Sequence, residues 1–182
     1  LFVVMMTIVG GRVIPFFTAR GAQLPNIPVN SVLEIGVVVS TLICTVSYAA
    51  SFYWQALSIT AHGSALVAAL LHVARISQWR TSQTYSIPLL WSLHLAYLLM
   101  AIGVFVFGLS YFVTQVSVSN AIHIITIGAI GLMIFAMMSR VSLGHTGRPL
   151  QVTPTISVLF LLVVAAMASR VVLPIWFDGN WT

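Results

Sequence analysis

Long, uninterrupted apolar segments dominate this chain, and short polar breaks separate them. Each segment has about the length that spans the hydrocarbon core of a bilayer as an α-helix. The segments cover residues 1–17, 32–54, 57–76, 87–112, 118–140 and 155–176. Apolar and polar residues do not alternate within them, which argues against the strands of a membrane β-barrel. The pattern therefore predicts an all-α fold, a polytopic transmembrane helical bundle of about six helices.

Composition agrees with this prediction. Hydrophobic residues make up 60% of the chain and charged residues 5%, and the mean hydropathy is +1.09. A soluble domain has about 25% charged residues, so this chain cannot cover a water-facing surface and its first partner is the lipid bilayer. The chain starts at Leu1 and is apolar from that residue, without the basic stretch and cleavage site of a signal peptide. We therefore expect a piece of a longer protein that starts inside a helix.

The net charge is +5, and all seven basic residues are arginines. In a soluble protein such a charge would suggest nucleic acid, but here six of the seven arginines lie toward the end of, or just after, the first, third and fifth segments. This positive-inside pattern assigns every second loop to the cytoplasm and removes the need for a nucleic-acid partner. These loops are residues 18–31, 77–86 and 141–154. Arg170 is the exception, inside the last helix, and Glu34 lies where an arginine is the expected partner.

Four of the five histidines, His62, His72, His94 and His123, fall within predicted helices. A single membrane histidine is readily explained by a hydrogen bond to a neighbouring helix. Four on three adjacent helices favour cofactor or proton chemistry, because neutral imidazole is the commonest ligand of metals and haem in helical bundles. With a rise of ~1.5 Å per residue, His72 and His94 lie toward the cytoplasmic side and the other two near the outer side. His94 and His123 therefore suit two centres at different depths better than one metal ion.

Two further groups of side chains have a functional and a structural explanation. Arg12 and Arg140 are candidates to hold haem propionates through charge-assisted hydrogen bonds, although arginine is ordinary at cytoplasmic helix ends. Met133, Met137 and Met138 suit packing, while thioether sulfur also suits copper(I). Both explanations stay open at this point.

A specific motif connects the chain to a known family. The stretch from Met137 to Leu150, which contains Leu-Gly-His-Thr-Gly-Arg, resembles the signature of the NnrS family. Three more stretches fit this family in order: Gly10 to Thr18, Leu93-His94-Leu95 after Trp91, and Ile122-His123 leading into Thr126 to Gly131. The resemblance implies a multi-pass protein of the bacterial inner (cytoplasmic) membrane with haem b and copper, associated with nitric oxide metabolism and nitrosative-stress resistance.

The resemblance also implies that residues 1–182 are a single transmembrane domain, the C-terminal half of a longer membrane protein. The missing N-terminal half carries another histidine-rich motif in this family, so a complete metal site can draw ligands from it. Within this chain, His94 and His123 are the first candidates for metal ligands, because they lie in family stretches. His72 and His62 come next as cofactor-binding residues, and His145 is expected in a loop, suited to holding a turn or a propionate.

Two other function classes stay open. The chain could belong to a proton-coupled transporter or channel with intramembrane histidines, or to a non-catalytic membrane sensor or subunit. Within the first hypothesis, turnover is also open, because binding, sequestering or exchanging nitrosyl ligands would use the same histidines as reducing nitric oxide. The sequence names no catalytic residue.

Overall fold

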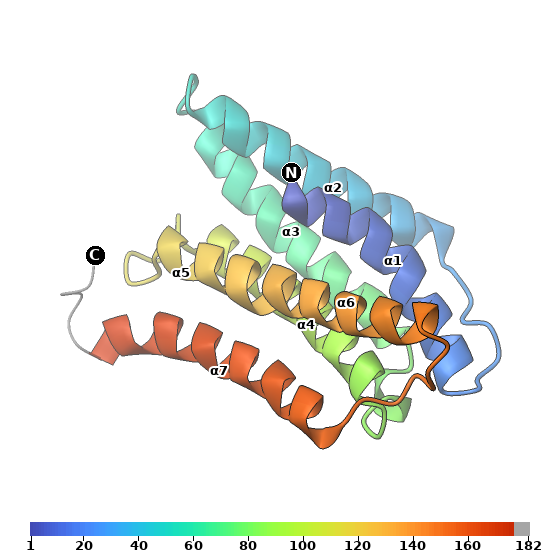
Figure 1. Cartoon of the computed structure of the whole chain (residues 1–182). Coiled ribbons are helices and arrows are strands. Elements are labelled where there is room, and N and C mark those ends of the chain that lie inside the picture. Colours follow the sequence, from blue (N-terminus) through green and yellow to red (C-terminus); the bar gives the residue numbers. More distant parts are fainter. Residues whose placement is uncertain (177–182) are drawn as a thin grey trace.

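The computed structural model describes residues 1–176, and this part is built from helices without a β-strand (Figure 1). Five membrane-length elements are α1 (Phe2–Gly21), α2 (Ser31–Ser51), α3 (Leu57–Ser77), α4 (Pro88–Leu109) and α7 (Pro154–Trp176). The remaining span, fifth along the chain, is continuous and consists of α5 (Val118–His123), the π-helical segment η2 (Ile124–Gly131) and α6 (Leu132–His145). It is called the α5–α6 span below. A short 3-10 helix, η1 (Thr81–Gln83), lies in the loop before α4. The predicted all-α bundle of six spans is confirmed for the described residues.

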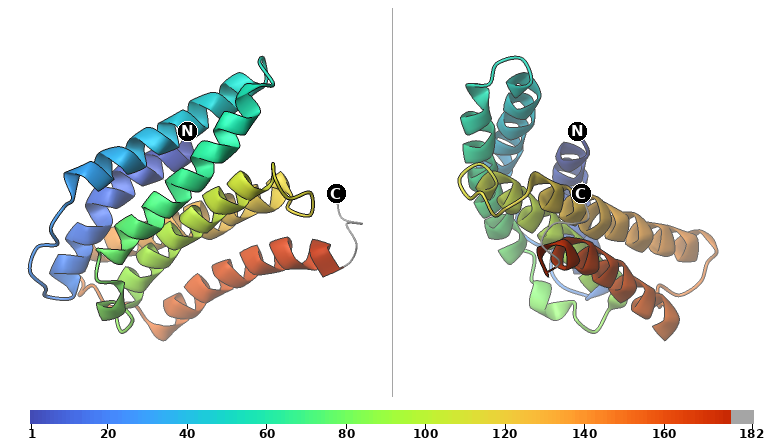
Figure 2. Two further views of the ribbon diagram at one scale, coloured as in Figure 1. Left: turned by 180° about the vertical axis from the view of Figure 1, so that it is seen from behind. Right: turned by 90° about the vertical axis from the view of Figure 1, so that its left-hand side faces the viewer.

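The central helix is α4, which contacts α3, α1 and all three parts of the α5–α6 span. It is apolar around its whole circumference and most of it is buried, as expected of a helix enclosed by others. The α2–α3 hairpin lies on one side of the bundle and α7 on the other (Figure 2). Because α7 packs mainly against the α5–α6 span, with Phe160 also meeting the ring of Trp91 on α4, and is mostly exposed, one side of it is free to face lipid or another chain.

Local sequence explains where several helices begin and end. The side chain of Asn30 accepts hydrogen bonds from two backbone N–H groups in the first turn of α2, and Pro88 starts α4 at a position that needs no N–H donor. The predicted first helix, residues 1–17, is too short, because α1 contains Pro15 and continues to Gly21. Proline is tolerated within membrane helices, where neighbouring helices compensate for the lost hydrogen bond. Arg20 therefore lies in the last turn of a helix.

The family stretch around Gly147 ends α6. His145 is the last residue of this helix, so the expectation of a loop position for it is wrong. Gly147 has a φ of +65°, the backbone N–H of Arg148 donates to the oxygen of Leu143 at 3.1 Å, and that of Gly147 donates to Gly144 at 3.3 Å. These bonds form a Schellman motif, in which glycine adopts the left-handed conformation without strain. Part of the family motif thus has a structural role.

Alternating helix directions bring the α1–α2, α3–α4 and α6–α7 loops to one end of the bundle (Figure 1). Arg80 and Arg148 lie in two of these loops, and Arg20 and Arg75 lie in the last turns of the helices before them. The predicted clustering of positive charge is therefore present, and the positive-inside rule assigns this end to the cytoplasm. Arg170 is exposed on α7, six residues before the last residue of that helix. At ~1.5 Å per residue this is about 9 Å from the outer end, within the distance over which a long side chain can snorkel to the interface.

Candidate functional site: buried histidines and a charged network

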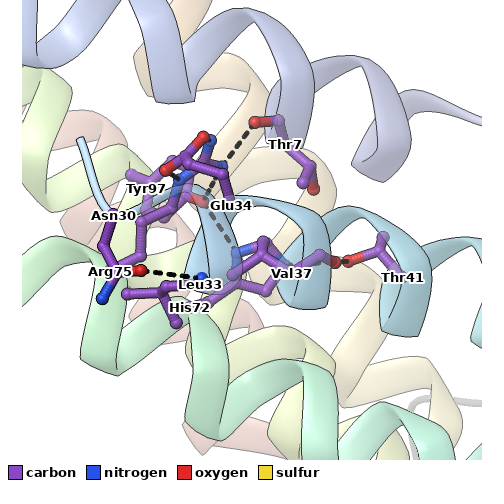
Figure 3. Close-up of polar contacts among 9 residues, drawn as sticks. All are labelled: Thr7, Asn30, Leu33, Glu34, Val37, Thr41, His72, Arg75 and Tyr97. Carbon is purple, nitrogen blue, oxygen red and sulfur yellow. Dashed lines mark hydrogen bonds and ion pairs between the residues drawn. The ribbon is translucent and has the colours of Figure 1, made fainter.

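Arg75 forms an ion pair in the interior of the bundle. Its side chain is only 2% exposed and lies in the last turn of α3. The guanidinium donates to both carboxylate oxygens of Glu34 on α2, with a distance of 2.6 Å between Nε and Oε1 (Figure 3). It also donates to the backbone oxygen of Thr7 on α1 at 2.7 Å and to the hydroxyl of Tyr97 on α4 at 3.0 Å. One side chain thus joins four helices, and the predicted arginine partner of Glu34 is confirmed.

The glycine pair of α1 makes this arrangement possible. A Cβ atom at position 11 would collide with the guanidinium of Arg75, and a Cβ at position 10 would lie 3.1 Å from the ring of Tyr97. Small residues let membrane helices approach closely. Gly10 and Gly11 therefore explain how α1 comes near enough for the carbonyl of Thr7 to accept a hydrogen bond from Arg75.

His72 continues the network toward the outer half of the bundle. Its Nδ1 lies 2.7 Å from the hydroxyl of Tyr97, and its Nε2 lies 3.2 Å from the hydroxyl of Thr41. Thr41 donates its only hydroxyl proton to the backbone oxygen of Val37 at 2.7 Å, so it accepts from Nε2–H of His72. Nδ1 then accepts from Tyr97, and the imidazole is neutral. Hydrogen bonds connect Glu34 to Thr41 without a break (Figure 3).

His94 is held in the same way in the N-terminal part of α4. Its Nε2 lies 2.8 Å from the hydroxyl of Thr18, and its Nδ1 lies 2.9 Å from that of Thr81. Thr18 donates to the backbone oxygen of Ile14 at 2.8 Å, which makes it the acceptor for His94. The ring also meets Trp79 edge-on, with centroids 6.0 Å apart. Both ring nitrogens are therefore engaged, and a bond from either one to a metal would replace a hydrogen bond.

His62, in the outer half of α3, has a different environment. Its Nδ1 lies 2.7 Å from the backbone oxygen of Ser58, and because a carbonyl only accepts, Nδ1 carries the proton and Nε2 the lone pair. The ring stacks on Phe107 at 4.5 Å and lies beside Tyr111. Among the described residues, Nε2 has no hydrogen-bond partner, and it is not fully buried, because Ser92 Oγ is the one fully buried side-chain polar atom of these residues without a partner. Metal-ligating histidines have this arrangement, with the second ring N–H held by a fixed acceptor.

His123 is half-buried and ends α5, where the backbone changes to the π-helical segment. Such segments are common at functional sites. The two outer histidines lie beside different faces of α4, because Gly108 packs against α3, which carries His62, whereas Gly103 packs against α5 and η2. In the part that the structure describes, no three His, Cys, Asp or Glu side chains lie close enough to hold one metal ion.

The two arginines expected to hold propionates line different cavities. Arg12 is exposed and lines a cavity of about 700 Å³ between α1 and α2, together with Arg20 and Glu34. Arg140 is buried and lines a cavity of about 450 Å³ between α1 and α6, together with Arg20 and His145. The structure therefore does not bring Arg12 and Arg140 together around one ligand.

Sequence reasoning did not identify Tyr97 as the partner of His72, nor Arg75 as the partner of Tyr97. By position alone, Arg75 is an ordinary basic residue near a helix end, and Tyr97 is one aromatic residue within an apolar segment. Spacing offers a signal for both, because Arg75 follows His72 by three residues and Tyr97 follows His94 by three. Residues at this spacing share one face of a helix, so a buried histidine marks the residue three positions on as a candidate member of the same buried polar network.

Six membrane-length helices around a buried ion pair and intramembrane histidines define a multi-pass membrane protein with a polar interior. A family model described as "NnrS protein" matches residues 1–182, the whole of the chain. The chain belongs to the NnrS family, as its motifs predict. Comparisons with curated proteins and with solved structures gave no match.

Proposed function

We propose that this chain is part of a haem b- and copper-containing protein of the bacterial inner membrane that takes part in nitric oxide metabolism or resistance to nitrosative stress. Family membership supports the proposal. The observation that carries it within this chain is the ring of His62, whose Nδ1 is fixed by the carbonyl of Ser58 at 2.7 Å. This leaves the lone pair of Nε2 for a metal.

His62 fits a haem or copper ligand because its tautomer and ring orientation are already set by Ser58 and Phe107. Bound haem iron would supply a coordination position for nitric oxide. The protein's part is to present one nitrogen, keep the ring from rotating and exclude water with the surrounding aromatic rings. A preorganised ligand of this kind loses little freedom on binding.

His123 is the second ligand in this proposal. We assign it to a different centre because the elements that carry His62 and His123 pack against different positions of α4, Gly108 and Gly103. A copper ion with three or more ligands would take some from side chains beyond those that the structure describes. His94 serves as a ligand only if a metal replaces its bond to Thr18 or Thr81. In the observed arrangement, His94 and His72 support helix packing.

Proton-coupled transport is the second candidate, and one observation favours it. The hydrogen-bond chain from Glu34 to Thr41 runs between two cavities, of about 700 Å³ beside Glu34 and about 200 Å³ beside Thr41. However, Arg75 stands in the middle of that chain, and a guanidinium does not release its proton in proteins. The chain therefore lacks a transfer step between Glu34 and Tyr97, which favours the haem and copper proposal.

The test uses the purified full-length protein with His62→Ala, His123→Ala and the matched control Thr60→Ala, an exposed position of α3. Haem is measured as the pyridine haemochrome and copper by metal analysis. We expect haem to fall in one histidine variant and copper in the other, with the control unchanged. Stable proteins that keep both cofactors in both variants would overturn the ligand assignment. Transport in liposomes without bound metal would favour the transporter, and neither property would favour a sensor or subunit.

A further inference from the structure

A groove runs between α1 and the α5–α6 span, and its two parts differ in chemistry. The outer part has a volume of about 320 Å³ and is lined by apolar residues of α1 between Phe2 and Ile14 and of the facing span between Ile130 and Met137. The cytoplasmic part has a volume of about 450 Å³ and contains the basic side chains of Arg20 and Arg140. Both helices run toward the same end of the bundle (Figure 1), so the two parts follow one another along one groove.

Arg140 has no carboxylate partner among the described residues. Its side chain is 9% exposed, and its guanidinium lies over the ring of Phe17, 3.9 Å from the centroid. The sequence has two acidic residues: Glu34 pairs with Arg75, and Asp178 lies outside the described range. A buried cation in a membrane protein is costly without an anion, and an aromatic face compensates only in part.

A second cation lies beside the same cavity. Arg20 lines it from α1, with its guanidinium 4.6 Å from the centroid of Phe16. Two guanidinium groups above aromatic rings at the cytoplasmic end match a phosphate in charge and in hydrogen-bond donors. Below them, the exposed apolar side chains of Val9 and Ile134 line the outer part of the groove and face the bilayer. Basic pockets between helices on the cytoplasmic side bind anionic lipid headgroups.

We propose that this groove binds an anionic phospholipid of the cytoplasmic leaflet, with its phosphate between Arg20 and Arg140 and an acyl chain along the apolar part. A zwitterionic lipid carries its own ammonium group and neutralises the two arginines less well. Haem propionates share the charge, but the histidine that lines the groove, His145, lies in the cytoplasmic part beside the two arginines. No histidine lines the apolar part, so a haem with its propionates on the arginines would have no imidazole ligand there. The inference is independent of the cofactor proposal.

The test is native mass spectrometry of the purified full-length protein in detergent, with added phosphatidylglycerol or phosphatidylethanolamine. We expect phosphatidylglycerol to bind more tightly by at least about fivefold, the factor that one basic residue near a membrane surface contributes. Arg140→Gln should remove most of this preference, and Val9→Trp should weaken binding by filling the apolar part. Arg80→Gln, an exposed arginine at the same end of the bundle, is the matched control and should bind as the wild type.

Other outcomes would overturn the proposal. Equal binding of the two lipids, or unchanged binding by Arg140→Gln, would contradict it. Displacement of phosphatidylglycerol by an equal concentration of inorganic phosphate would mean that the acyl chain is not recognised. Loss of haem from Arg140→Gln with lipid binding intact would assign the arginine to a propionate. If Arg140→Gln does not fold, Arg20→Gln replaces it, because this exposed side chain should reduce the preference without affecting folding.

Discussion

Arg75 on α3 and Glu34 on α2, 41 residues apart in the sequence, form a bidentate ion pair inside the helix bundle. The pair also determines the position of α1, because the same guanidinium donates to the carbonyl of Thr7. A buried ion pair contributes little compared with an apolar replacement of both partners, whereas removing one partner leaves an uncompensated charge. The network therefore maintains one arrangement of four helices, and its members should be sensitive to single substitutions.

Glu34→Ala should destabilise the full-length protein by about 3–5 kcal/mol, because it leaves the buried guanidinium of Arg75 without its carboxylate. Thermal unfolding in a mild detergent measures the effect. Ser31→Ala, at an exposed position one turn earlier on α2, is the control and should be within about 0.5 kcal/mol of the wild type. Equal stability of the two variants would mean that the ion pair contributes nothing to the fold.

Gly11→Ala and Gly63→Ala should change stability in opposite directions. A methyl group at position 11 collides with the guanidinium of Arg75, whereas at position 63 it meets no atom within 4 Å. Overpacking costs about 1–3 kcal/mol, while alanine is up to about 1 kcal/mol better than glycine within a helix. Unfolding curves of both variants measure this difference. A stabilised Gly11→Ala variant would show that Arg75 does not need the space above α1.

Helix content could be predicted from the sequence because each apolar segment has the length of a span, which depends on local composition alone. The extension of α1 beyond residue 17 to Gly21 could not, since this stretch is helical where it packs against α4, with Thr18 bound to His94 and Gly21 close to Leu90. Depth from helix register correctly grouped His72 with His94, which the structure connects through Tyr97 and Trp79.

The partners of the histidines depend on packing between distant segments. Thr18, which binds His94, is 76 residues away from it in the sequence, and Thr41 is 31 residues away from His72. Hydrophobic periodicity does not determine which threonine of a neighbouring helix faces a given histidine, because several rotations of an almost uniformly apolar helix satisfy it. The sequence therefore predicted which residues are polar inside the membrane, but not their contacts.

Tyr97→Phe should destabilise the protein by about 1–2 kcal/mol, because it removes the donor to Nδ1 of His72 and an acceptor for Arg75. Thr41→Val removes the acceptor at the other nitrogen of the same ring. Since both act through His72, the effects of the two substitutions should not add in the double variant. Unfolding measurements on the single and double variants test this, with exposed Tyr85→Phe as the control. Strict additivity would contradict a shared role of the ring.

The role of His94 can be separated from that of a ligand by changing its partner instead of the histidine. Thr18→Val keeps the shape of the side chain but removes the acceptor for Nε2–H of His94. If the ring supports packing, stability should fall by about 1–2 kcal/mol while haem and copper contents and the Soret spectrum stay unchanged.

Thr126→Val is the matched control for this experiment, because the hydroxyl of Thr126 is exposed and donates to a backbone oxygen within its own span, that of Ile122. This variant should change neither stability nor spectrum. If His94 binds a metal through one ring nitrogen instead, the hydrogen bond at the other ring nitrogen sets the basicity of the imidazole ligand. Loss of the Thr18 acceptor should then shift the Soret band or lower the metal content. A shifted spectrum in Thr18→Val alone would therefore restore His94 as a ligand and reject its assignment to packing.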